Sequence, residues 1–140
     1  MDDIRSMNDP RMALIHVMVL TSAADGDMSD GELRTIGDTV RMLPIFAGID
    51  GDTLPLIARE ITGVLDHDDG LMRAMEHIKD ALPPRLRETA YALACDIAAV
   101  DGVLTQEELR LLEIIRHTLD LDRLVSAAIE RGARARWMVL

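Results

Sequence analysis

Acidic residues recur in two copies of one short motif, and their spacing suits the binding of a cation. The first copy is DGDMSDGELR at residues 25–34, and the second is DGVLTQEELR at residues 101–110. Both copies read D-G-x-[apolar]-[S/T]-x-x-E-L-R, and every match falls at one offset of 76 residues (101 − 25 = 76). Each copy carries an Asp and a Glu seven residues apart, and carboxylate oxygens are the ligands that hard divalent cations prefer.

Packing of the two copies around a pseudo-two-fold axis would bring their carboxylates together. The residues concerned are Asp25, Glu32, Asp101 and Glu108, with Asp27 and Glu107 at the edge. Neighbouring carboxylates cannot all stay ionised unless a cation, an arginine or raised pKa values relieve the repulsion. The predicted metal ligands are Asp25, Asp27, Glu32, Asp101 and Glu108. Ca²⁺ is favoured over Mg²⁺, and Zn²⁺ is less suited because no His or Cys belongs to the motif.

Helix capping explains part of the same motif without any metal. The glycine can end one helix, and Ser29 or Thr105, with a Glu three residues later, forms a capping box that starts the next. Asp25 and Asp101 are not needed for this, and a carboxylate at a helix C-terminus is unfavourable by roughly 0.3–1 kcal/mol. The sequence therefore leaves two alternatives open: metal ligation, or capping with Arg34 and Arg110 as partners of the carboxylates.

The first copy is not an EF-hand loop. Asp25, Asp27 and Ser29 occupy the first, third and fifth positions of such a loop. However, Asp30 stands at the glycine position, and Ile36 stands where the bidentate Glu is required.

Seven helices are predicted to position these turns. Apolar residues recur at helical spacing over about residues 10–24, 30–43, 53–65, 70–82, 85–100, 106–119 and 123–136. Residues 66–69 are expected to cap the fourth helix. The predicted class is all-α, with helix–turn–helix units in a pseudo-two-fold repeat within one compact bundle. We expect a disordered segment at 1–9 and a single domain over 10–140, with repeat halves at about 10–65 and 84–137.

Composition narrows the classes of partner. A net charge of −10 disfavours nucleic acid and anionic lipid and favours cations or basic protein surfaces. The lone Cys95 cannot form an intrachain disulfide and is expected in the core. Because the chain shows neither a signal peptide nor an apolar stretch of about 20 residues, we expect a cytoplasmic protein without direct membrane insertion.

Other candidate sites are weaker. His67-Asp68 resembles the HD dipeptide of metal-dependent phosphohydrolases, but the remaining histidines lack a diagnostic spacing. His16 lies in an apolar stretch, where a packing role is favoured. The arginines near residues 131–136 suit a helix C-terminus, with a basic docking tail as the alternative. No nucleophile–base pair or phosphate-binding glycine loop is present, so no enzyme activity is expected.

The chain resembles the tellurite-resistance TerB-like family over roughly residues 10–130. The resemblance is carried by Ala23-Ala24-Asp25-Gly26 through Glu32-Leu33, and by Ala98-Ala99-Val100-Asp101-Gly102 through Glu108-Leu109. It implies a bacterial, non-enzymatic, all-α protein with an internal repeat and a role in tellurite resistance or stress response. It further implies an acidic metal-binding surface at Asp25, Glu32, Asp101 and Glu108, and protein partners that include complexes peripheral to the inner membrane. Val103 departs from the Asp27 pattern, so the second half would contribute fewer ligands.

Two functional hypotheses follow from the sequence. In the first, a cation at the two turns ties the halves together and biases a surface read by partner proteins. In the second, the chain is a structural or scaffolding domain without a metal site, acting through a groove for a partner helix or a homodimer face. Thermal stabilisation by divalent ions separates the two.

Overall fold

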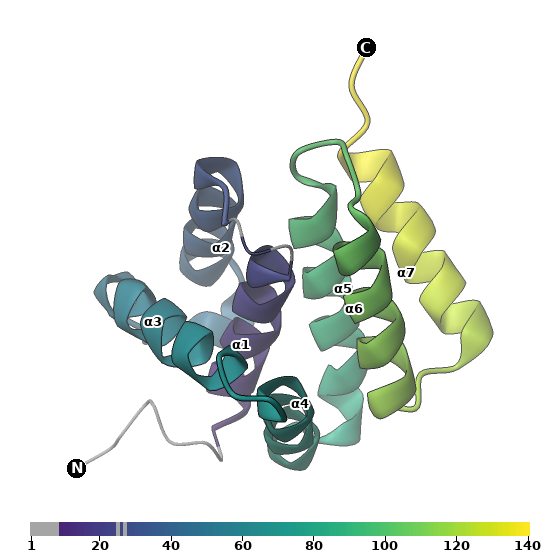
Figure 1. Ribbon diagram of the computed structural model, residues 1–140. Coiled ribbons are helices and arrows are strands. Elements are labelled where there is room, and N and C mark those ends of the chain that lie inside the picture. Colours follow the sequence, from purple (N-terminus) through teal and green to yellow (C-terminus); the bar gives the residue numbers. More distant parts are fainter. Residues whose placement is uncertain (1–8, 25, 27) are drawn as a thin grey trace.

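The computed structural model describes residues 9–24, 26 and 28–140, and its secondary structure is helical throughout, with no strand in this part of the chain (Figure 1). The α-helices are α1 (Pro10–Ala23), α2 (Asp30–Met42), α3 (Leu54–Leu65), α4 (Gly70–Ala81), α5 (Arg87–Ala99), α6 (Gln106–Thr118) and α7 (Arg123–Arg136). Short 3₁₀ helices occur at Pro44–Phe46, Gly51–Thr53 and Pro84–Leu86. The predicted all-α class with seven helices is confirmed. Most of the segment predicted to be disordered lies outside the described residues, and Asp9 caps α1 by accepting a hydrogen bond from the Arg11 amide.

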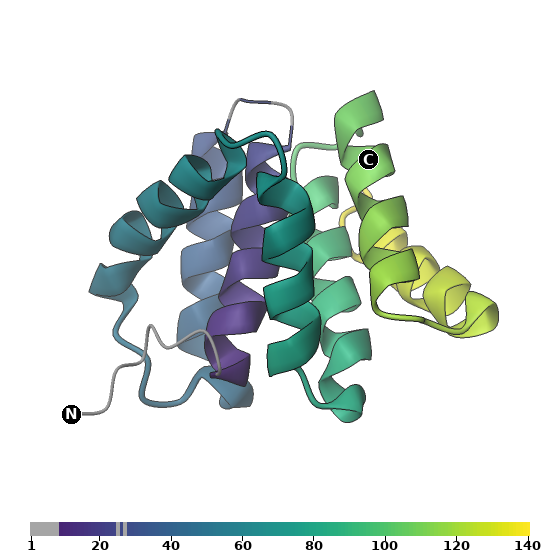
Figure 2. The ribbon, with the colours of Figure 1, turned by 60° about the horizontal axis from the view of Figure 1, so that its bottom comes forward.

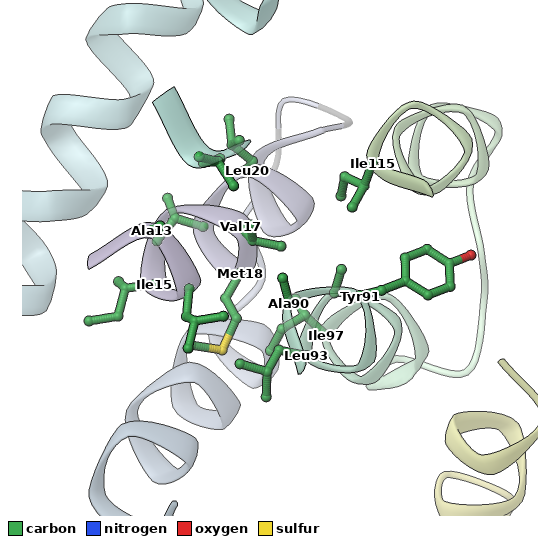
Figure 3. Packing of buried hydrophobic residues seen from close by; sticks show 14 of the residues in the cluster. Ala13, Ile15, Val17, Met18, Leu20, Ala90, Tyr91, Leu93, Ile97 and Ile115 are labelled. Carbon is green, nitrogen blue, oxygen red and sulfur yellow. The ribbon is translucent and has the colours of Figure 1, made fainter. Parts of the chain in front are cut away.

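Helix α1 lies at the centre of the bundle. Every residue from Met12 to Ser22 is buried, as expected for a helix that is apolar on all sides. It packs most extensively against α5 and is also covered by α2, α3 and α4 (Figure 2). Figure 3 shows the side chains of Val17 and Met18 beside those of Ala90 and Leu93, so the core joins α1 to α5. None of the described helices is long and apolar enough to cross a membrane.

The internal repeat is visible in the helix boundaries. Helices α2 and α6 start and end at the same offset of 76 residues that relates the two motifs, and so do the ends of α1 and α5. Gly26 and Gly102 have φ angles of 82° and 77°, a left-handed conformation that glycine adopts without strain. Each hairpin is followed by a helix that packs on its first member, α3 on α1 and α7 on α5. Helix α4 lies between the two units and contacts α1, α3 and α6.

The start of α4 differs from the prediction. Asp69 precedes the helix, but its side chain makes no capping bond. Its backbone has φ −105° and ψ 17°, whereas a capping residue is normally extended. The carboxylate instead pairs with Arg73 at 2.9 Å. The prediction that residues 66–69 cap α4 is therefore wrong, because the short link from α3 imposes a different backbone.

Candidate functional site

Ser29 and Glu32 start α2 with a complete capping box. The Glu32 amide donates to the Ser29 hydroxyl at 3.0 Å, and the Ser29 amide donates to Glu32 Oε1 at 3.2 Å. The Ser22 hydroxyl on α1 also donates to Oε1, at 3.0 Å. Glu32 is only 4% exposed. The glutamate therefore links α1 to α2 in addition to capping the helix.

Thr105 and Glu108 start α6 in the same way. The Thr105 amide donates to Glu108 Oε1 at 3.0 Å, and the Glu108 amide donates to Thr105 Oγ1 at 3.1 Å. Glu108 is 3% exposed. Ala98 occupies the position that Ser22 has in the first repeat, so Glu108 receives no equivalent bond from the preceding helix. Both glutamates confirm the capping function predicted from the motif.

Asp101 connects the two repeats. Its Oδ2 accepts a hydrogen bond from the Ser29 hydroxyl at 3.0 Å, across 72 residues of sequence. Its Oδ1 lies beside Gly31, where an added β-carbon would be only 3.3 Å away. The carboxylate thus lies over the first turn of α2, at the positive end of that helix dipole. This contact offsets the unfavourable position of Asp101 just beyond the C-terminal end of α5.

The carboxylates of the two turns repel one another at Glu32. Burial raises the pKa of Glu32, and the negative charges of Glu108 and Asp101 raise it further. Hydrogen bonds from Ser29 and Ser22 act in the opposite direction. The carboxylates of the second turn therefore lie close enough to Glu32 to disfavour its ionisation, as expected from pseudo-two-fold packing.

The predicted metal ligands are brought together only in part by the residues that the structure describes. Glu32, Asp101 and Glu108 lie at the junction of the two turns, whereas Asp25 and Asp27 lie outside the described residues. The described part of the chain contains no group of three or more His, Cys, Asp or Glu residues arranged to hold a metal ion.

The arginines expected to pair with these carboxylates do not do so in the described residues. Arg110 pairs with Glu113 at 3.2 Å. Within residues 9–24, 26 and 28–140, no hydrogen bond or ion pair joins Arg34 or Arg110 to the three carboxylates at the junction. Hydroxyl groups donate to all three carboxylates instead, the α2 dipole lies beside Asp101, and the pKa of Glu32 is raised.

Ser22 is the site residue that the sequence reasoning missed. The helical periodicity predicts only that Ser22 belongs to the apolar helix at about residues 10–24. A polar side chain within an otherwise buried helix usually has a hydrogen-bond partner. A serine in this apolar helix was therefore the one sign in the sequence that Ser22 bonds to another residue. The partner, Glu32, is ten residues away and follows a turn, so the helical periodicity did not identify it.

Glu32→Gln is expected to raise the melting temperature at pH 7 in EDTA by about 2–4 °C, equivalent to about 1 kcal/mol. Glutamine can keep the capping box while removing a buried charge that Glu108 and Asp101 disfavour. The gain should shrink as pH falls through the raised pKa, because the wild-type carboxyl then becomes neutral. Circular dichroism melts would measure both effects.

Glu107→Gln is the matched control for this prediction. It makes the same change in net charge at an exposed position in the first turn of α6. Neutralising a carboxylate at a helix N-terminus should lower stability slightly. If Glu32→Gln melts at or below the temperature of Glu107→Gln, the repulsion inferred at Glu32 is contradicted.

Comparison with known proteins gives one match. The family model described as "Tellurite resistance protein TerB" matches residues 11–131. The matched segment begins in α1, ends in α7 and contains both acidic turns. No curated protein and no solved structure matches the chain.

Proposed function

The chain belongs to the TerB family of tellurite resistance proteins, and from this premise we propose that it is a non-enzymatic helical module that responds to divalent cations. The observation that carries the proposal is the hydrogen bond from Ser29 to Asp101, which joins the acidic turns of the two repeats. A cation bound at this junction would stabilise both turns at once. It would thereby fix the relative positions of the α1–α2 and α5–α6 hairpins.

The hydrogen bonding of the two glutamates supports the proposed site. In both Glu32 and Glu108 the capping bonds go to Oε1. Within the described residues, Oε2 accepts no hydrogen bond in either glutamate, and neither oxygen is among the fully buried atoms that lack a partner. Each glutamate can therefore cap its helix through one oxygen and offer the other to a cation.

The donor set suits Ca²⁺ better than the other common cations. The proposed ligands are the carboxylates of Asp25, Asp27, Glu32, Asp101 and Glu108, all of them hard oxygen donors. Ca²⁺ accepts six to eight such ligands in flexible arrangements, whereas Mg²⁺ demands near-octahedral geometry and retains water. Zn²⁺ usually takes nitrogen or sulfur ligands in proteins, and the motif provides neither.

The description of the matched family, a tellurite resistance protein, supports a role of this kind for the chain. We propose that the cation-bound bundle presents a surface to partner proteins during a bacterial stress response, with complexes at the inner membrane among those partners. The protein itself would act in the cytoplasm.

Calcium is expected to raise the melting temperature of EDTA-treated protein by several degrees. A ligand that binds only the folded state contributes about 2.7 kcal/mol when its free concentration is 100 times Kd. The measurement is a thermal melt at pH 7 with millimolar CaCl₂, compared with KCl at the same ionic strength. Isothermal titration with a panel of divalent cations would then give the stoichiometry and the order of preference.

Substitutions of the proposed ligands test whether the calcium-induced rise in melting temperature arises at the junction of the two acidic turns. Asp101→Asn and Glu32→Gln should each reduce the calcium-induced shift, because each removes one proposed ligand charge. Asp68→Asn, at an exposed position in the α3–α4 link, is the matched control and should leave the shift intact. Identical melting temperatures with and without divalent ions would reject the cation site. The alternative, a structural or scaffolding domain whose acidic turns serve only as caps, would then be preferred.

A further inference from the structure

A pocket of about 650 Å³ lies between α5, α6, α7, the α5–α6 link and the residues that follow α7. These three helices form one side of the bundle, with the C-terminal residues close to the α5–α6 link (Figure 1). The walls of the pocket are mostly apolar. They include Ala98, Leu109, Leu112, Ala133, Met138 and Val139. This volume falls in the range of pockets for small ligands, roughly 300–1,000 Å³.

The charged groups around the pocket mostly neutralise one another. The Tyr91 hydroxyl donates to Glu130, and Glu130 also pairs with Arg116 at 3.7 Å. Glu113 pairs with Arg110 at 3.2 Å. Glu113 and Glu130 therefore already have cationic or hydroxyl partners within the protein, and neither needs a cation from solution to balance its charge.

Arg134 is the exception among the charged residues that line the pocket. It is exposed on α7, and it forms no hydrogen bond or ion pair with any residue of the described segments. The pocket therefore combines an apolar wall with one arginine that has no ion-pair partner among the described residues. An anionic group at this position would gain a partner, and an apolar chain would cover the exposed wall.

We propose that this pocket binds a long-chain carboxylic acid, with the alkyl chain along the apolar wall and the carboxylate at Arg134. Alkyl burial would supply most of the affinity. Arg134 would supply the preference for an acid head group through a charge-assisted hydrogen bond. Gly102 and Leu104 of the second acidic turn lie at one end of the pocket, but Glu32, Asp101 and Glu108 do not line it. Fatty-acid binding can therefore be tested separately from the proposed cation response.

Trp137 provides a direct readout of pocket occupancy. It lines the pocket and is the only tryptophan in the chain, so its emission reports on this site alone. Titration with dodecanoate below its critical micelle concentration is expected to give a saturable change in emission. Isothermal titration should give one molecule per chain. Dodecanol and dodecyltrimethylammonium, which share the chain but lack the acid, should bind about tenfold more weakly.

Two pairs of exposed substitutions separate specific binding from general detergent-like adsorption. Arg134→Gln should weaken dodecanoate binding about tenfold and leave dodecanol unchanged, whereas Arg131→Gln, on the same helix but outside the pocket lining, should change neither. Leu109→Ser should weaken both ligands. Leu33→Ser is its control, because Leu33 holds the equivalent position in the first repeat and is similarly exposed, 41% against 48%, but does not line the pocket.

Several outcomes would overturn the proposal. Emission that does not saturate, or dodecanol binding as tight as dodecanoate, would exclude a fatty-acid site. Equal effects of Leu109→Ser and Leu33→Ser would show non-specific adsorption. A dimer in sedimentation velocity that Leu109→Ser dissociates, without dodecanoate binding, would show that a second copy covers the pocket.

Discussion

Gly70→Ala is expected to cost more than about 4 kcal/mol, a large part of the roughly 5–15 kcal/mol that stabilises a typical folded domain. Gly70 is the first residue of α4, and a β-carbon there would overlap the carbonyl oxygen of Val64. It would also lie 2.8 Å from the carbonyl carbon. Because both are backbone atoms, no rotamer change relieves the overlap. The last turn of α3 or the first turn of α4 must move.

The cost extends beyond the link because α4 joins the two halves of the bundle. Ala74, Met75 and Ile78 on this helix belong to the core, and α4 contacts α1, α3 and α6. Close-packed interiors accommodate such displacements poorly. A shift at Gly70 would therefore disturb the packing on α1, which is buried along almost its whole length.

Gly63→Ala is the matched control for this prediction. Gly63 lies in α3, is exposed, and has no atom within 4 Å of an added β-carbon. Alanine there should stabilise the protein by about 0.4–1 kcal/mol, through higher helix propensity and a less flexible unfolded chain. Urea unfolding of both variants tests the pair. A Gly70→Ala protein that unfolds at the wild-type urea concentration would contradict the tight α3–α4 link.

The helices could be predicted from the sequence because their signals are local. Ser29 with Glu32, and Thr105 with Glu108, identify helix starts within four residues of sequence, and Gly26 and Gly102 identify the preceding stops. The repeat offset then relates the boundaries of α2 and α6. The exception, the start of α4, depends on the path of the α3–α4 link, which the residue types at 66–69 do not specify.

The candidate site could be predicted only as a set of residue types. Spacing identified Glu32, Asp101 and Glu108, but the contact between Asp101 and Ser29, 72 residues apart, depends on how the two hairpins pack. The helix dipole that stabilises Asp101 belongs to the other repeat, so the residues around Asp101 in the sequence could not identify it. The Oε1 oxygens committed to capping likewise became identifiable only from the side-chain geometry.

Acid is expected to destabilise the protein strongly through His16. This side chain is 7% exposed in α1 and makes no hydrogen bond with the described residues. Burial lowers its pKa to about 4, and the nearby charge of His77 contributes in the same direction. Above the unfolded value of about 6.5, His16 is neutral in both states and has no effect. As pH falls from 6.5 to 4, the unfolded chain binds a proton that the folded chain rejects, which costs about 3 kcal/mol.

Urea unfolding of the wild type and His16→Leu at pH 7 and pH 4 isolates this contribution. Leucine fills a similar volume without titrating, so the variant should gain about 3 kcal/mol relative to wild type between the two pH values. The raised pKa of Glu32 acts in the opposite direction but is present in both proteins, so it cancels in the difference. Val19→Ala, a buried change on the same helix without a titrating group, should cost the same at both pH values. If wild type and His16→Leu lose equal stability on acidification, His16 is not kept neutral by the core.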